Sequence, residues 1–174
     1  MSTQPEISDA PAGALVFLRG EKGADLAEIH SSILREPGVV AGIPVFGDWN
    51  ILLRLAAKDR QSLEQLIEKQ IRPVKGVESF EAHYREETWT ASCDNAEHKA
   101  AACAVLDVDS GSLSGLTARL RATTGIVEGN VTGGGKKIVL FLRGKSSREI
   151  KNVLGCEVRL LPGVLRIKLL NTMN

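Results

Sequence analysis

The sequence repeats itself at an offset of 87 residues, and this repeat limits the possible architecture more than any single motif. Without a gap, residues 38–42 (GVVAG) align with residues 125–129 (GIVEG), and residues 51–55 (ILLRL) align with residues 138–142 (IVLFL). The register holds from about residue 14 to the last residue. A chain that contains an internal sequence duplication is expected to fold as two similar units.

Each copy of the repeat shows the element order βαββαβ. Strands are expected in the first copy at residues 14–19, 39–46, 49–56 and 77–85. Gly47 and Asp48 are expected to close a two-residue hairpin. Helices are expected after Asp25 and after Asp59, which stand at N-cap positions.

The second copy repeats this pattern with different turn chemistry. Strands are expected at residues 101–108 and 136–143, with residues 133–135 (GGG) in place of the first hairpin turn. Ser112 and Ser146 are expected to cap its helices, and Ser146 forms a capping box with Glu149. The agreement between the copies supports the same fold for both.

A βαββαβ unit folds as a four-stranded antiparallel sheet with both helices on one face. The predicted fold class is therefore α+β, with two tandem ferredoxin-like units. The expected domains are a disordered tail (1–13), the first unit (14–87), a linker (88–100) and the second unit (101–174). Because the other sheet face carries no helices, we expect the sheets to pair in an intrachain pseudo-dimer and a homo-oligomer.

Strand alternation identifies the residues of that open face. Ser79, Glu81 and His83 share it in the first unit, and Arg166 and Lys168 occupy the positions equivalent to Ser79 and Glu81 in the second. Residues 1–100 hold 11 Lys and Arg against 16 Asp and Glu, whereas residues 101–174 hold 11 against 5. We therefore expect a sheet-face interface in which Glu81 approaches Lys168 or Arg166.

The turn between the second and third strands has a distinctive composition. It reads Gly47-Asp48-Trp49-Asn50, and an acidic helix cap at Asp59 and a later Gly-Val pair follow it. In this pattern residues 45–84 resemble the effector-binding (RAM-like) domain of Lrp/AsnC transcription regulators, although Asn50 stands where that family usually has Asp. The second unit, with its glycine turn, looks more like the broader ACT-like domains.

The resemblance implies a domain that pairs through its sheet and binds an amino acid or another small effector near this turn. Gly47, Asp48, Trp49 and Asn50 are accordingly the expected ligand-binding residues, with Trp49 as an apolar wall and Asn50 as a hydrogen-bonding group. Gly47 and Asp48 equally suit a purely structural turn. Residues 1–13 are too short for a helix-turn-helix, so no direct nucleic-acid binding is expected.

No catalytic residues, metal ligands or cofactors are predicted. Cys93, Cys103 and Cys156 lack a C-x-x-C spacing, and His30, His83 and His98 have no matching ligand cluster. The longest apolar runs are far shorter than the roughly 20 residues that span a bilayer. We expect a cytoplasmic protein without membrane contact.

These observations predict a small-molecule-binding regulatory or sensor protein rather than an enzyme. Two alternatives stay open. One is a peptide-binding maturation chaperone like the NapD family, which would bind a peptide at an open sheet edge. The other is an enzyme of the dimeric αβ-barrel kind, with His83 near a tetrapyrrole or quinone.

Overall fold

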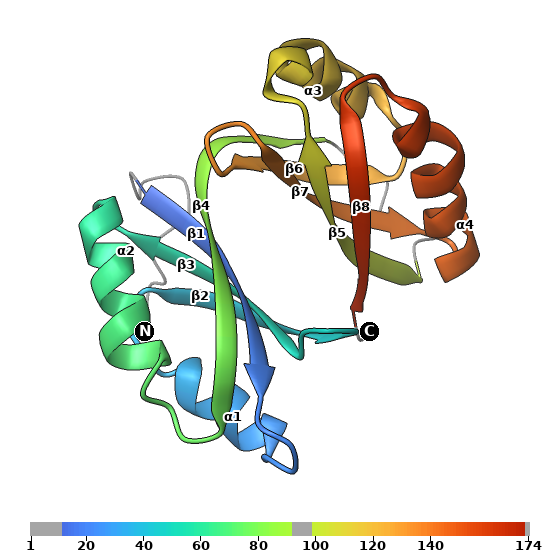
Figure 1. The fold of residues 1–174 in the computed structure, drawn as a ribbon. Helices are drawn as coiled ribbons and strands as arrows, with labels where there is room; N and C mark the ends of the chain where they lie inside the picture. The colour runs from blue at the N-terminus through green and yellow to red at the C-terminus, as the bar shows by residue number, and fades with distance from the viewer. Residues whose placement is uncertain (1–11, 92–98, 173–174) are drawn as a thin grey trace, which may run out of the picture. The chain divides into compact units, whose positions relative to one another are not determined.

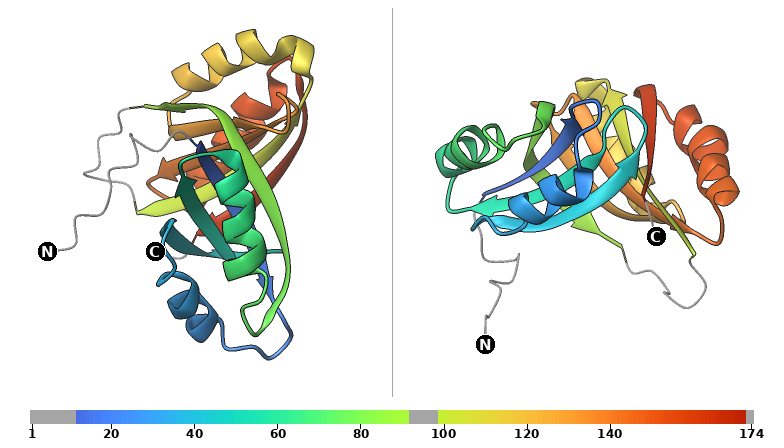
Figure 2. Two further views of the ribbon diagram at one scale, coloured as in Figure 1. Left: turned by 90° about the vertical axis from the view of Figure 1, so that its left-hand side faces the viewer. Right: turned by 90° about the horizontal axis from the view of Figure 1, so that it is seen from below.

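The computed structural model describes residues 12–91 and 99–172, and the chain divides into two compact units, Met1–Tyr84 and Arg85–Asn174. Each unit is built on an antiparallel sheet whose helices cover one face (Figures 1 and 2). The predicted α+β class with two ferredoxin-like units is confirmed. Most of the predicted tail and of the predicted linker lies outside the described residues.

The first sheet has the strand order β4-β1-β3-β2. Its strands are β1 (Ala12–Gly20), β2 (Val39–Phe46), β3 (Ile51–Ala57) and β4 (Val77–Thr90). Its helices are α1 (Leu26–Ile33) and α2 (Arg60–Leu66), and a π-helical turn (Ile67–Ile71) continues α2. The central strands β1 and β3 are the most apolar because neighbouring strands flank them on both sides.

The second sheet has the corresponding order β8-β5-β7-β6. Its strands are β5 (Ala100–Val108), β6 (Ile126–Thr132), β7 (Lys137–Gly144) and β8 (Val164–Thr172). Its helices are α3 (Leu113–Ala122), which follows a 3₁₀ turn (Ser110–Ser112), and α4 (Ser147–Asn152), which a π-helical turn (Val153–Glu157) and a 3₁₀ turn (Val158–Leu160) continue.

The two units share their strand register and helix packing at the 87-residue offset. Ile43 pairs with Leu52 in the first unit, and Asn130 pairs with Val139 in the second. The buried residues of the second helix recur every four positions in both units: Leu63, Ile67 and Ile71, and then Ile150, Leu154 and Val158. Four exceeds the α-helical period of 3.6, and the wider π-helical turns keep the third residue on the core side.

β4 continues to Thr90, five residues beyond its predicted end at Arg85. Up to Tyr84 it pairs with β1, and from Arg85 onward it pairs with β6 as an additional strand of the second sheet. Trp89 lies opposite Gly129, and a Cβ atom at Gly129 would overlap its indole ring. The linker interpretation of residues 88–90 missed this strand because Trp89 is its single buried apolar residue.

Two turns differ from their predicted form. The β2–β3 connection spans residues 47–50 rather than two residues, and the Val45 N–H donates to the Asn50 carbonyl across it. Asp109, rather than Ser112, caps the start of the α3 region: its carboxylate accepts from the Gly111 N–H and the Ser112 hydroxyl. The stronger carboxylate acceptor three residues upstream takes the capping role and adds a 3₁₀ turn.

Candidate functional site

The predicted ligand-binding turn is held against the end of β1. The Arg19 Nε donates to the Asp48 carbonyl oxygen at 2.7 Å. The Gly20 N–H donates to the Asn50 side-chain oxygen at 2.9 Å, and the Asn50 N–H donates to the Leu18 carbonyl at 2.8 Å. Asn50 therefore fixes the turn with both its backbone and its side chain.

Trp49 lies beside the same end of β1. The Arg19 guanidinium carbon is 5.1 Å from the centroid of the Trp49 ring, within the range of a cation–π interaction. The Phe17 ring centroid is 6.4 Å from Trp49, with the two planes tilted by 39°. Arg19 thus contacts both the backbone and the aromatic side chain of the turn.

His83 and Glu81 lie together on the sheet face away from the helices. The alternate β4 residues Phe80, Ala82 and Tyr84 pack against the core on the helix side. The His83 Nε2 is 2.8 Å from the Glu81 Oε1. Phe17 meets the His83 ring edge-on, with centroids 5.3 Å apart. Phe17 therefore contacts both His83 and Trp49 within the first unit.

The remaining predicted interface residues occupy the strands that alternation indicated. Ser79 lies on β4 opposite Arg19. On β8 of the second unit, Arg166 pairs with Asp107 and Lys168 pairs with Val105. The Lys137 Nζ is 2.7 Å from the Asp107 Oδ1. The approach of Glu81 to Lys168 or Arg166 would join the two units and stays a prediction.

A cavity of about 260 Å³ lies at the same end of the first unit as the Gly47–Asn50 turn. This follows from the ladders, since Leu18 pairs with Ile51 and Gly20 pairs with Val77. The cavity is lined by charged side chains of both signs together with an apolar one: Glu21, Lys22, Asp25, Glu28, Lys75 and Ile29. The sequence alone did not predict this cavity, because its walls combine the β1–α1 loop and α1 with a loop about 50 residues later in the chain.

The structure offers no candidate metal centre or disulfide in its described part. No group of three or more His, Cys, Asp or Glu is arranged to hold a metal ion among these residues. Cys103 is buried on β5 and Cys156 is exposed, and neither forms a disulfide within the described residues, while Cys93 and His98 lie outside them. No helix in residues 12–91 and 99–172 is long and apolar enough to cross a membrane.

Residues 13–89 match the family described as the Lrp/AsnC ligand binding domain. The first unit matches the Lrp/AsnC ligand-binding domain. The match covers the four strands and two helices of the unit together with the Gly47–Asn50 turn, so the resemblance predicted from the turn is confirmed. None of the curated proteins compared matches the chain in sequence.

Solved structures extend the comparison beyond the Lrp/AsnC domain. The siroheme decarboxylase NirDL superposes with a TM-score of 0.70 at 12% identity, over 93% of this chain and 71% of that chain. Its co-complex with an iron-uroporphyrin III analogue gives a TM-score of 0.67. A transcriptional regulator from Neisseria meningitidis in complex with L-Met gives 0.43 at 17% identity, over 50% of this chain and 57% of that one. The similarity to NirDL shows a shared fold.

Proposed function

We propose that this protein is a small-molecule-binding regulatory protein and that its first unit binds an amino acid or a similar metabolite. The observation that carries the proposal is the match of residues 13–89 to the Lrp/AsnC ligand-binding domain. In this role the chain binds the small molecule, and any DNA binding belongs to a separate partner protein.

The cavity at this end of the first unit has the chemistry that a zwitterion needs. Lys22 and Lys75 supply positive charge for a carboxylate, and Glu21 and Glu28 supply negative charge for an ammonium group. A volume of about 260 Å³ suits a ligand of amino-acid size.

Regulation then follows from differential binding. A ligand changes the balance between two assemblies of the protein only if it binds one of them more tightly. Charged loops at the end of a sheet are suited to this role. A ligand that neutralises their charges changes the electrostatic potential that they present to a neighbouring protein surface.

The test is a thermal-shift screen of the twenty amino acids, followed by isothermal titration calorimetry on each compound that raises the melting temperature. The double variant Lys22→Ala/Lys75→Ala should weaken binding at least tenfold. Lys69→Ala is the matched control, because Lys69 lies on the π-helical turn after α2 and does not line the cavity. Failure of every amino acid to bind, or equal binding by the double variant, would reject the proposed site.

A second candidate function rests on His83. Its imidazole is buried and lies 2.8 Å from the Glu81 carboxylate, and the fold over 93% of the chain is that of a siroheme decarboxylase. An imidazole paired with a carboxylate is a good axial ligand or proton donor for an iron tetrapyrrole. In this alternative the open sheet face of the first unit binds the macrocycle as substrate.

Absorption spectroscopy separates the two candidates. Titration with iron-uroporphyrin III should produce a saturable Soret shift if the second candidate holds, and His83→Ala should abolish the shift. His30→Ala is the control, because the His30 Nε2 lies 2.9 Å from the Gly42 carbonyl on the helix side of the sheet. A spectrum that does not change excludes the tetrapyrrole alternative and leaves the first proposal intact.

A further inference from the structure

β6 carries three polar side chains on the sheet face away from the helices of the second unit. These residues, Glu128, Asn130 and Thr132, are called here the β6 polar strip. The alternate positions face the core: Val131 belongs to the hydrophobic core, and Gly129 lies under the Trp89 ring. The strip therefore lies on the open face, with side chains about 7 Å apart along the strand.

Two members of the strip are fully buried. Asn130 and Thr132 each expose 0% of their surface. Neither the Asn130 Oδ1 nor the Thr132 Oγ1 has a hydrogen-bond partner within residues 12–91 and 99–172. Buried polar atoms without partners are rare and costly, so each calls for a physical explanation.

The orientation of the Asn130 amide follows from its neighbours. Its Nδ2 donates to the Glu128 Oε1 at 2.9 Å and lies 3.4 Å from the Val139 carbonyl oxygen. Both neighbours are acceptors, so the amide nitrogen faces them. The Asn130 Oδ1 is then an acceptor directed elsewhere, and a partner for it must be a donor.

The repeat shows that the fold does not require polar residues here. At the 87-residue offset, Glu128, Asn130 and Thr132 correspond to Ala41, Ile43 and Val45, which are apolar. The ladders agree, because Ile43 pairs with Leu52 as Asn130 pairs with Val139. The second unit therefore has polar side chains where the first unit forms the same strand without them.

We propose that the β6 polar strip is a binding site for the primary ammonium group of a small molecule. The Asn130 Oδ1 and the Thr132 Oγ1 accept hydrogen bonds from the ammonium N–H groups, and the Glu128 carboxylate supplies the opposite charge. This site lies in the second unit and does not depend on the cavity proposed for the first. Either site can fail in an experiment without affecting the other.

The test uses putrescine as the probe and tetramethylammonium as a cation of the same charge type without N–H donors. Calorimetry on the full chain should show saturable binding of putrescine and none of tetramethylammonium. In ¹H–¹⁵N spectra, putrescine should shift the side-chain amide signal of Asn130, identified by its loss in Asn130→Leu. Equal binding of the two cations, or shifts confined to the first unit, would overturn the proposal.

Variants distinguish a ligand site from a structural one. Thr132→Val should weaken putrescine binding at least tenfold without lowering the melting temperature, because valine replaces a hydroxyl that has no partner in the described chain. The control is Thr117→Val, which removes a buried hydroxyl that donates to the Ser114 carbonyl at 3.0 Å and should leave binding unchanged. Absence of putrescine binding would mean that water alone satisfies these atoms, and would end the proposal.

Discussion

The side-chain oxygen of Asn50 accepts a hydrogen bond from the backbone N–H of Gly20 at 2.9 Å. This bond ties the β2–β3 connection to the end of β1. Asn50→Leu should lower the free energy of unfolding by about 1–3 kcal/mol, because it leaves a part-buried N–H without a partner. Asn50→Asp keeps an acceptor and should cost less, and urea denaturation measures both. Equal stability of wild type and Asn50→Leu would contradict this structural role.

Gly129 is required by the close approach of Trp89. Because a Cβ atom at this position would overlap the indole ring, Gly129→Ala should destabilise the second unit by about 1–3 kcal/mol. Gly115→Ala on α3 is the matched control, since nothing lies within 4 Å of its added Cβ. That change should raise the free energy of unfolding by about 0.5–1 kcal/mol, because alanine has a higher helix propensity than glycine. Thermal unfolding that ranks the two variants in the opposite order would disprove the contact.

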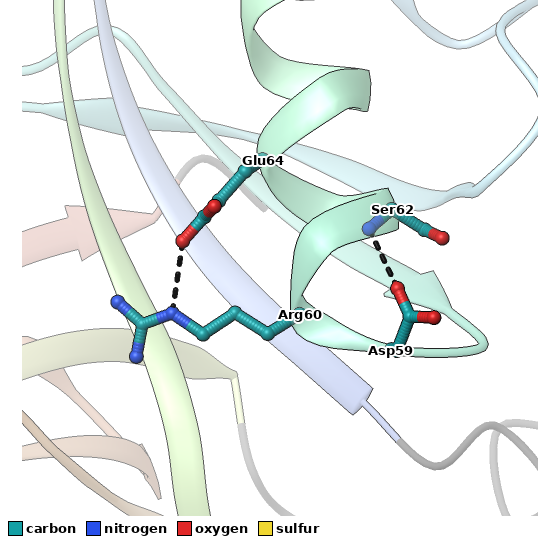
Figure 3. Close-up of polar contacts among 4 residues, drawn as sticks. All are labelled: Asp59, Arg60, Ser62 and Glu64. Carbon is teal, nitrogen blue, oxygen red and sulfur yellow. Dashed lines mark hydrogen bonds and ion pairs between the residues drawn. The ribbon is translucent and has the colours of Figure 1, made fainter.

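Asp59 caps α2 with a hydrogen bond from the Ser62 N–H at 2.7 Å (Figure 3). The backbone N–H and the hydroxyl of Ser62, and then Lys58, lower the pKa of Asp59 below 3.8. The unfolded state then binds the proton more readily, so the cap's contribution is complete above about pH 3.8 and is lost as the pH falls through the folded-state pKa. In the variant Asp59→Asn, the asparagine side chain still accepts the capping hydrogen bond at the start of α2 but carries no titratable charge.

Urea denaturation of wild type and Asp59→Asn at several pH values checks this prediction. The stability difference in favour of wild type should be constant near neutral pH and should shrink below about pH 3.8. Arg60→Gln is a suitable control: it removes the bond from the Arg60 Nε to the Glu64 Oε1 at 3.0 Å and leaves the Asp59 cap intact. A difference that does not vary with pH would show that the Asp59 charge plays no part.

Tyr84 is the only tyrosine of the chain, so its titration can be followed directly at 295 nm. Burial and then the negative charge of Glu64 raise its pKa above 10.0, and the Arg60 guanidinium, 4.1 Å from the ring centroid, opposes this shift. Arg60→Gln should raise the pKa further. Since the folded-state pKa is raised, the stability that Tyr84 contributes is complete below pH 10 and is lost as the pH rises through that pKa. Identical titration of folded and guanidinium-unfolded protein would contradict the shift.

Some elements of the fold could be predicted because their signals are local. Asp25 caps α1 by accepting from the Ala27 and Glu28 N–H groups, and Ser146 accepts from the Glu149 N–H at the start of α4. Helix caps depend on residues within one turn. Strand β2 (Val39–Phe46) has the predicted bounds, because a Gly-bounded apolar run suffices to define it.

Other features depend on partners distant in the sequence. β4 extends beyond its predicted end because Thr88, Trp89 and Thr90 pair with β6, a partner strand about 40 residues later in the sequence. Leu26 and Leu34 have the same helical spacing as Ile29 and Ile33, yet they expose 39% and 41% of their surface, whereas Ile29 and Ile33 fill the core. The short α1 presents only these two side chains fully to the sheet.

The amino-acid sequence by itself determined the duplicated βαββαβ order and the Lrp/AsnC character of the first unit, because periodicity, caps and turn motifs are encoded within short segments. Only the tertiary structure decided that the Asn50 side chain accepts from the Gly20 N–H and that the loops around Lys22 and Lys75 form a cavity with α1. It also decided that the buried Asn130 Oδ1 and Thr132 Oγ1 have no hydrogen-bond partner in the described chain. These properties arise from strand pairing and packing between distant segments, which no local pattern specifies.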